Sequence, residues 1–132
     1  MIGVGGFGKV FRGYYNAKEV AIKAARNFDD AEPEVAKERV LKEGQIFWLL
    51  KHENIISLHG ICLDGPHMCL IMEYARGGPL NRILGTGRRI RPDVLIDWAI
   101  QVARGMNYLH HGAPISLVHR DLKSANGKLK QD

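Results

Sequence analysis

The first 25 or so residues have the pattern of a β-rich segment. Residues 2–28 are rich in Gly, Val, Ile, Phe and Tyr, and a turn signal stands at Asn16. This composition is typical of strands bounded by tight turns. It predicts two strands, a hairpin and a third strand that ends near Ala25.

A helix and two further strands are expected next. The acidic stretch 29–34 surrounds Pro33, and negative charge favours the start of a helix because it meets the positive end of the helix dipole. We expect this helix to reach about Leu50, with Val40 and Phe47 on its apolar side. The segments 55–63 and 68–74 then have the pattern of two buried strands joined by a short Gly-Pro turn.

The second half has a helical pattern. A hinge is expected at 77–79 and a short helix at 80–84. From Pro92, apolar residues recur every three or four positions up to Gly112, which predicts an amphipathic helix. A short apolar strand at 115–118 is expected to lead into a loop at 119–126.

Together these elements predict an α+β fold with two lobes. We expect a five-stranded antiparallel small lobe with one helix at residues 1–75, a hinge or linker at 76–79, and the start of an incomplete helical lobe at 80–132. We find no internal repeat.

Composition excludes several function classes. The 132 residues are 45% hydrophobic and 25% charged, as in an ordinary globular domain. No apolar run long enough for a membrane span occurs, and no leader peptide is recognisable, so we expect a cytoplasmic protein without membrane contact. The net charge of +5 is spread along the chain, so we expect no nucleic-acid partner.

Cys62 and Cys69 flank a turn and are expected to be reduced thiols that face each other across a hairpin.

The glycine-rich segment Gly3-Val4-Gly5-Gly6-Phe7-Gly8 is the first candidate site. The same spacing occurs in dinucleotide-binding folds, where a helix follows, and Gly3, Gly8 and Lys9 also fit a P-loop, which needs Ser or Thr next. Here Val10 follows, and the next residues are strand-like. The segment therefore indicates a hairpin that covers phosphate groups.

Charged residues at fixed distances complete a phosphoryl-transfer motif set. Lys23 follows Val20-Ala21-Ile22 in a strand, and Glu43 is its expected partner, with Glu38 as the alternative. In the loop His119-Arg120-Asp121-Leu122-Lys123-Ser124-Ala125-Asn126, Asp121 is the expected acceptor of a hydroxyl proton and Asn126 a magnesium ligand.

Taken together, these motifs resemble a protein kinase, and over residues 2–126 the chain is similar to the mixed lineage kinases. The segment Met72-Glu73-Tyr74-Ala75-Arg76-Gly77-Gly78 and the insertion Ala113-Pro114-Ile115 carry the more specific part of this resemblance. The resemblance implies a serine/threonine kinase that uses ATP and Mg²⁺ and phosphorylates MAP kinase kinases in stress signalling toward the Jun kinases. Lys123, two positions after the aspartate, is similar to serine/threonine-specific members.

The resemblance also assigns roles to individual residues. It implies catalytic roles for Asp121, Lys123, Lys23 and Glu43, and a metal-binding role for Asn126. Phe47, Leu58 and His119 are expected to stack as spine residues. The residues implied in ATP binding are Ile2, Gly3, Val4, Gly5, Gly6, Phe7, Gly8, Lys9, Val10, Ala21, Lys23, Met72, Glu73 and Ala75.

Some positions depart from the family pattern. Gly127-Lys128-Leu129-Lys130 follows the catalytic loop where an apolar strand is expected, with Lys128 at the expected adenine floor, and Asp-Phe-Gly does not occur in the chain. The opening strand lacks its first half, and Gly44 costs a helix about 1 kcal/mol relative to Ala. The apolar stripe of the long helix also needs another element packed against it, because apolar side chains stabilise a fold when they are buried. We therefore expect this polypeptide alone to be inactive and poorly folded in its second half; the alternative function is a non-catalytic nucleotide- or partner-binding module.

Overall fold

A computed structural model describes residues 1–5, 8–25 and 32–130. These residues form two compact units. The first contains Met1–Leu50 and Ile56–Tyr74, and the second contains Lys51–Ile55 and Ala75–Asp132.

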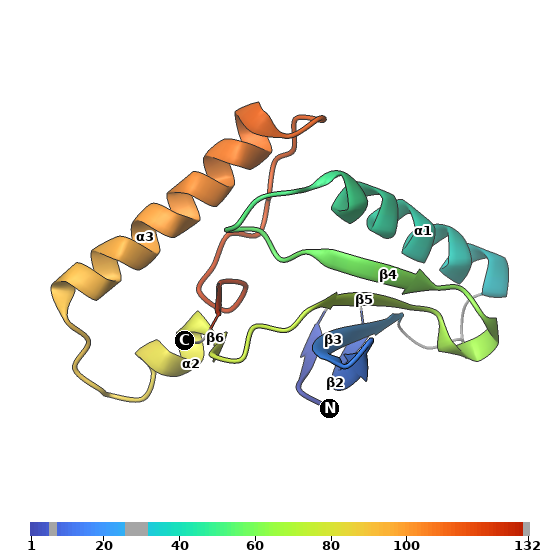
Figure 1. Cartoon of the computed structure of the whole chain (residues 1–132), viewed down its shortest axis with the longest axis horizontal. Helices are drawn as coiled ribbons and strands as arrows, with labels where there is room; N and C mark the ends of the chain where they lie inside the picture. Colours follow the sequence, from blue (N-terminus) through green and yellow to red (C-terminus); the bar gives the residue numbers. More distant parts are fainter. Residues whose placement is uncertain (6–7, 26–31, 131–132) are drawn as a thin grey trace. The chain divides into compact units, whose positions relative to one another are not determined.

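The first unit is built on a five-stranded antiparallel sheet with strand order β1-β2-β3-β5-β4. Figure 1 shows helix α1 running along one face of this sheet. The strands are β1 (Gly3–Gly5), β2 (Gly8–Tyr15), β3 (Lys18–Ala25), β4 (Leu58–Cys62) and β5 (Cys69–Glu73). The predicted α+β fold with five antiparallel strands and one helix is thereby confirmed.

A two-residue turn connects β2 to β3 at the predicted position. Asn16 and Ala17 both have positive φ angles, 48° and 61°. Positive φ at both central residues defines the turn type whose twist matches that of the flanking strands. The hairpin therefore keeps a regular register from Gly8↔Ala25 to Tyr15↔Lys18.

Helix α1 (Pro33–Leu49) closes the core of the first unit. Pro33 stands at the first helical position, where its missing N–H costs nothing. Val40 is fully buried and Phe47 packs against the same apolar cluster. The buried members of this cluster are Ala36, Val40, Leu58, Met68, Leu70 and Met72.

The predicted strand 55–63 is shorter than expected. Only Leu58–Cys62 is a strand, because the preceding residues form a turn in which Ile55 N–H donates to the His52 carbonyl (3.1 Å). The Ser57 carbonyl oxygen then accepts a hydrogen bond from the Glu73 N–H (2.8 Å). A 3₁₀ turn at Gly65–His67 joins β4 to β5, as the Gly-Pro signal predicted.

The second unit contains helices α2 (Leu80–Leu84) and α3 (Pro92–Asn107), both at their predicted positions. Helix α3 continues into a π-helical turn, Tyr108–Gly112, so the helical segment ends at Gly112 as expected. Figure 1 shows α3 as a long straight helix. Among the helices of residues 32–130 and the other described ranges, none is both long enough and apolar enough to cross a bilayer.

Residues Lys51–Ile55 pack in the second unit, whereas the sequence analysis placed them in the first lobe. The Lys51 N–H donates to the Tyr108 hydroxyl (2.8 Å), and the His52 ring stacks on Tyr108 with ring centroids 4.9 Å apart. Gly105 allows the close approach of this segment, since a Cβ atom there would lie 3.1 Å from the Asn54 carbonyl oxygen.

The predicted apolar strand at 115–118 is wrong: the structure assigns no strand to these residues. Their polar groups bond to the end of the preceding helical segment. Leu117 N–H donates to the Leu109 carbonyl (2.9 Å), and the Ser116 hydroxyl donates to the His110 carbonyl (3.2 Å). These bonds replace the pairing that a strand would need.

Two short strands pair in the second unit where the sequence analysis expected a hinge and a departure from the family pattern. β6 (Gly78–Pro79) pairs with β7 (Lys128–Leu129). Gly77 N–H also donates to the Leu129 carbonyl (2.9 Å). A strand therefore does follow the loop at 119–126, despite the lysine-rich sequence of that strand.

The apolar stripe of α3 is only partly buried. Leu95 is 40% exposed and Val102 37%, Trp98 and Met106 are half-buried, and Leu109 in the following turn is buried. This part of the unit has little core of its own.

Candidate functional site

Lys23 and Glu43 form an ion pair inside the first unit. Lys23 lies on β3 and Glu43 on α1, and the Lys23 Nζ atom is 2.6 Å from Glu43 Oε1. The two side chains are only 26% and 20% exposed. Glu38, the alternative partner, lies on an exposed part of α1. The structure thus selects Glu43 over Glu38.

Gly44 explains how α1 comes close enough to the sheet. A Cβ atom at this position would collide with Ile61 Cδ1, and it would lie 3.1 Å from Ile61 Cγ1 and 3.3 Å from Leu70 Cδ2. Gly44 is buried. The glycine that seemed only a cost to the helix is therefore a contact point between α1 and strands β4 and β5.

Four of the residues expected to bind ATP are brought together on neighbouring strands. Val10 is the register partner of Lys23, and Ala21 is the register partner of Met72. Since side chains alternate along a strand, Ala21 and Lys23 project from the same face. This face also carries the ion pair with Glu43.

The glycine-rich segment lies on the edge of the same sheet. Gly3 pairs with Val10, and Ile2 N–H donates to the Val10 carbonyl (2.8 Å). Val4 and Lys9 are also register partners, as are Gly5 and Gly8. Gly6 and Phe7 lie outside the described residues.

Hydrogen bonds fix the backbone at the end of β5 and just after it. Glu73 N–H donates to the Ser57 carbonyl, and one Glu73 carboxylate oxygen accepts the Ser57 N–H (3.2 Å). These contacts fix Glu73 at the end of the strand. Ala75 is buried in the second unit, where its carbonyl accepts the Gly78 N–H (3.0 Å).

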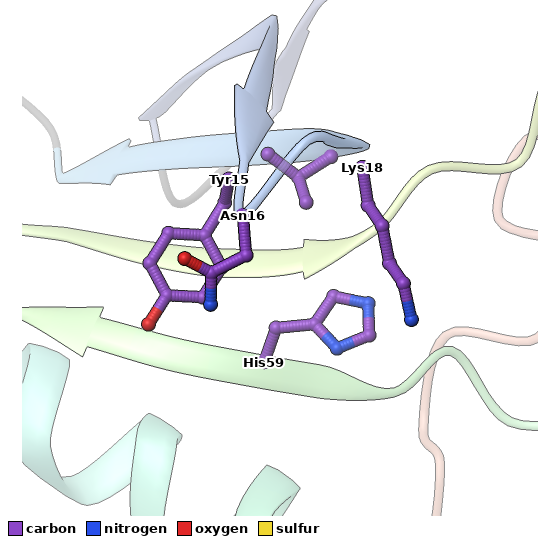
Figure 2. Close-up of a pocket in the computed structure, with 5 residues that line it drawn as sticks. Tyr15, Asn16, Lys18 and His59 are labelled. Atoms are coloured by element: carbon purple, nitrogen blue, oxygen red, sulfur yellow. The ribbon is translucent and has the colours of Figure 1, made fainter.

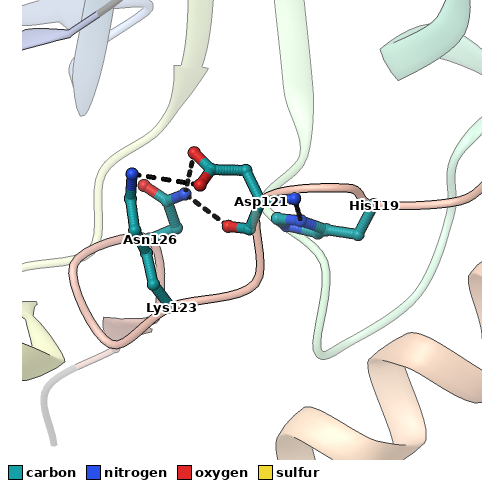
Figure 3. A network of polar contacts seen from close by, with 4 residues as sticks. All are labelled: His119, Asp121, Lys123 and Asn126. Carbon is teal, nitrogen blue, oxygen red and sulfur yellow. Dashed lines mark hydrogen bonds and ion pairs between the residues drawn. The ribbon is translucent and has the colours of Figure 1, made fainter.

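The second unit contains a polar network around Asp121, shown in Figure 3. Lys123 Nζ lies 3.0 Å from Asp121 Oδ1, and Asn126 Nδ2 donates to Asp121 Oδ2 (3.0 Å) and to its carbonyl (2.8 Å). The Asp121 N–H donates to His119 Nδ1 (3.3 Å). All four residues belong to the loop that the sequence analysis singled out. The bond to His119 was not foreseen.

Two features hold the Asp121 carboxyl ionised and in place. The hydrogen bond from Lys123 is the main cause that lowers the pKa of Asp121 below its usual value, and the bond from Asn126 is the second.

The preceding residue, Arg120, has a φ of 64°, which is uncommon for a residue other than glycine. Such backbone strain is concentrated at functional sites.

The loop provides one suitable oxygen for a magnesium ion. Because the Asn126 amide nitrogen donates to Asp121, its Oδ1 atom remains as an acceptor, and Mg²⁺ prefers oxygen ligands. No cluster of three or more His, Cys, Asp or Glu side chains with metal-ligand geometry occurs among the described residues. Asn126 therefore fits a shared metal site in which phosphate oxygens supply further ligands.

A separate hollow in the first unit contains none of these residues. Figure 2 shows it between the β2–β3 turn and β4. Its volume is about 160 Å³, and it is lined by Tyr15, Asn16, Lys18, Val20 and His59. It is smaller than typical ligand pockets, which enclose about 300–1,000 Å³.

Contacts are seen for two of the three predicted spine residues. Phe47 and Leu58 belong to the same apolar cluster in the first unit. His119 is an exposed residue of the second unit. Its stacking with the other two stays a prediction. Lys128 is likewise exposed and donates to the Ala125 carbonyl (2.9 Å), and its place beneath adenine stays a prediction.

Comparison with known proteins assigns the chain to a family. The family of protein tyrosine and serine/threonine kinases matches residues 1–131. The chain is 58% identical to human mitogen-activated protein kinase kinase kinase 10 over 126 residues, which are 96% of the chain and 13% of that protein. It is equally 58% identical to a Drosophila melanogaster mitogen-activated protein kinase kinase kinase, over 96% of the chain and 11% of that protein. Identity to human mitogen-activated protein kinase kinase kinase 11 is 53%, over 99% of the chain and 15% of that protein.

The chain therefore spans only 11–15% of the length of these relatives. The match nevertheless covers nearly every residue of the chain, including the Lys23–Glu43 pair and the Asp121 loop. The predicted resemblance to the mixed lineage kinases is confirmed. The chain belongs to the protein tyrosine and serine/threonine kinase family.

Proposed function

We propose that this chain carries the ATP-binding and catalytic-loop residues of a protein serine/threonine kinase that phosphorylates MAP kinase kinases in stress signalling toward the Jun kinases. The names of the relatives, mitogen-activated protein kinase kinase kinases, support this choice of substrate. The observation that carries the proposal is the Lys23–Glu43 ion pair at 2.6 Å. We place the protein in the cytoplasm.

In this proposal residues within 1–75 bind the nucleotide. Lys23 binds its phosphate oxygens, and Glu43 orients the Lys23 ammonium group, as in the kinase motif set. Val10, Ala21 and Met72 contact the adenine ring, and Glu73 and Ala75 offer backbone groups to its edge. Further contacts come from Ile2, Gly3, Val4, Gly5, Gly6, Phe7, Gly8 and Lys9.

The second unit supplies the proton acceptor. The Asp121 carboxylate accepts the proton of the substrate hydroxyl and orients its oxygen for in-line attack. Lys123, 3.0 Å from the carboxylate, balances its charge. Asn126 would hold Mg²⁺ through its Oδ1 atom, and the ion would supply positive charge beside the phosphate oxygens.

The domain bounds belong to the same proposal. We assign residues 1–75 to a small lobe, 76–79 to a linker and 80–132 to the start of a large lobe.

Nucleotide-induced thermal stabilisation tests the proposal. We expect MgATP to raise the unfolding temperature of the 132-residue chain and the Lys23→Met variant to lose this shift. Lys18→Met is the matched control, because Lys18 is an exposed lysine that begins the same strand. Equal shifts in both variants would overturn the role of Lys23, and no shift in the unmodified chain would contradict nucleotide binding by this chain.

The second candidate is a non-catalytic module that binds nucleotide or a protein partner. The exposed apolar residues of α3, such as Ile96 at 61%, favour it. Phosphorylation of a purified MAP kinase kinase tests the kinase directly. Transfer that Asp121→Asn abolishes would support the kinase and overturn the expectation that this polypeptide alone is inactive, whereas nucleotide binding without transfer agrees with that expectation and with the module.

A further inference from the structure

Cys62 and Cys69 face each other across the β4–β5 hairpin. They are register partners and form the last pair before the turn. In an antiparallel ladder, opposite Cα atoms are about 4.5–5.5 Å apart. Disulfides span Cα separations of about 4.4–6.8 Å. The backbone therefore already has the spacing that a bond between the two sulfur atoms needs.

The neighbouring residues show which face the two thiols share. Ile61 and Leu70, the preceding register pair, both approach Gly44 of α1. Leu63, on the other side of Cys62, packs against the apolar core. Because side chains alternate along a strand, Cys62 and Cys69 project from the opposite face, away from α1.

The thiols are free and partly accessible. Both cysteines are unbonded and half-buried. Burial is the main cause that raises the pKa of Cys69, and the neighbouring Cys62 thiol raises it further. Since the thiolate is the reactive species, the raised pKa keeps Cys69 mostly protonated near neutral pH, and the pair should react faster as pH rises.

We propose that Cys62 and Cys69 are a modification site, a dithiol that a hydroperoxide converts into a reversible disulfide within the chain. This inference goes beyond kinase activity and does not depend on it. The pair occupies one end of the sheet that also carries Lys23. Cys69 is paired on its other side with Ala24, the residue after Lys23.

The chemistry is balanced by one equivalent of hydrogen peroxide. One thiolate attacks a peroxide oxygen, the O–O bond breaks, and water leaves after protonation, which gives a sulfenic acid. The second thiolate then attacks this sulfur, the S–S bond forms, the S–O bond breaks, and a second water leaves. Two thiols lose two protons and two electrons, and peroxide takes up both to become two molecules of water.

The test is oxidation of the whole chain, followed by trapping of remaining thiols. The chain contains only two cysteines, so the readout is unambiguous. After brief treatment with hydrogen peroxide, we expect iodoacetamide to label neither thiol, the monomer mass to fall by two hydrogen atoms, and one Cys62–Cys69 peptide link to appear. Dithiothreitol should restore both labels.

Two controls separate a preformed pair from chance collision. The same oxidation in urea should form the disulfide several-fold more slowly. A Cys62→Ser, Leu63→Cys variant keeps two thiols but places them on opposite faces, so it should remain labelled by iodoacetamide. If it misfolds, the urea comparison still decides the question.

Three outcomes would overturn the proposal. Both thiols could remain fully labelled after oxidation of the native chain. Links could form only between chains. The oxidised product could carry sulfinic acid and resist dithiothreitol.

Diamide, which oxidises dithiols without adding oxygen, should give the same link as peroxide.

Discussion

Lys23 and Glu43 are 20 residues apart in sequence, yet their charged groups lie 2.6 Å apart in a partly buried position. One comes from a strand and the other from the helix that covers the sheet. Partial burial makes such a pair stronger than one in open solvent, because water screens it less.

The first prediction concerns the Glu43→Gln variant. Loss of the carboxylate removes the ion pair between Lys23 and residue 43, so MgATP should bind roughly tenfold more weakly, as expected when a charge-assisted bond worth about 1.5–3 kcal/mol is lost. Glu38→Gln, on an exposed position of the same helix, should bind as the unmodified chain does. Titration calorimetry measures both affinities, and equal weakening in the two variants would contradict the assignment of Glu43.

The second prediction concerns Gly44 and Ile61. Gly44→Ala improves helix propensity by about 1 kcal/mol, but overpacking against Ile61 and fully buried Leu70 costs about 1–3 kcal/mol. We therefore expect a net loss of stability of about 1 kcal/mol, measured as a lower midpoint of denaturant unfolding.

Ile61→Val supplies the complementary change. It removes the Cδ1 atom that the new methyl group would meet. Ile→Val alone costs about 0.5–1.5 kcal/mol. The double variant should nevertheless be more stable than the sum of the two single changes predicts. Strictly additive effects would show that Gly44 and Ile61 do not share this contact.

The third prediction concerns the pKa of Asp121. A carboxylate that accepts hydrogen bonds from a cation favours its charged form, so its titration midpoint should lie below the usual value of about 3.9. Lys123→Met should raise the midpoint, and Asn126→Ala should raise it by less, because the Lys123 bond is the larger cause. Carbon-13 NMR of the Asp121 carboxyl measures this directly. The reverse order would rule out Lys123 as the principal partner.

The fourth prediction concerns the stability of α3. Burial of a large apolar side chain stabilises a fold by roughly 1.5–3 kcal/mol relative to exposure. Several apolar side chains of α3 are exposed and do not contribute this stabilisation. In the 132-residue chain, we expect amide hydrogens of α3 to exchange much faster than those of β3 and β5. Mass-spectrometric hydrogen exchange compares the two regions within one sample. Equal protection would show that the second unit is independently stable.

Much of the fold was predictable because it depends on local patterns. Glycine and β-branched residues indicated β2 and β3, and the three- and four-residue spacing indicated α3. The spacing of motifs also predicted that Lys23 would meet Glu43. In each case the signal lies within one element or at a fixed distance along the chain.

The remaining features depend on contacts that no local pattern encodes. Pro79 pairs with Lys128, far away in sequence, and the Tyr108 hydroxyl binds the Lys51 N–H. The role of Gly44 also depends on which side chains stand opposite it. Local apolar content at 115–118 predicted a strand, but bonds to the preceding helical turn took its place.

The packing of Lys51–Ile55 with the second unit has a practical consequence for dissecting this protein. The segment lies between α1 and β4 in sequence, but its partners Gln101, Gly105 and Tyr108 come much later. A truncation that ends at Tyr74 would keep the segment and discard all three partners. The boundary between the units is therefore not a single point at which the chain can be cut, and separating them cleanly requires redesign of two places in the sequence.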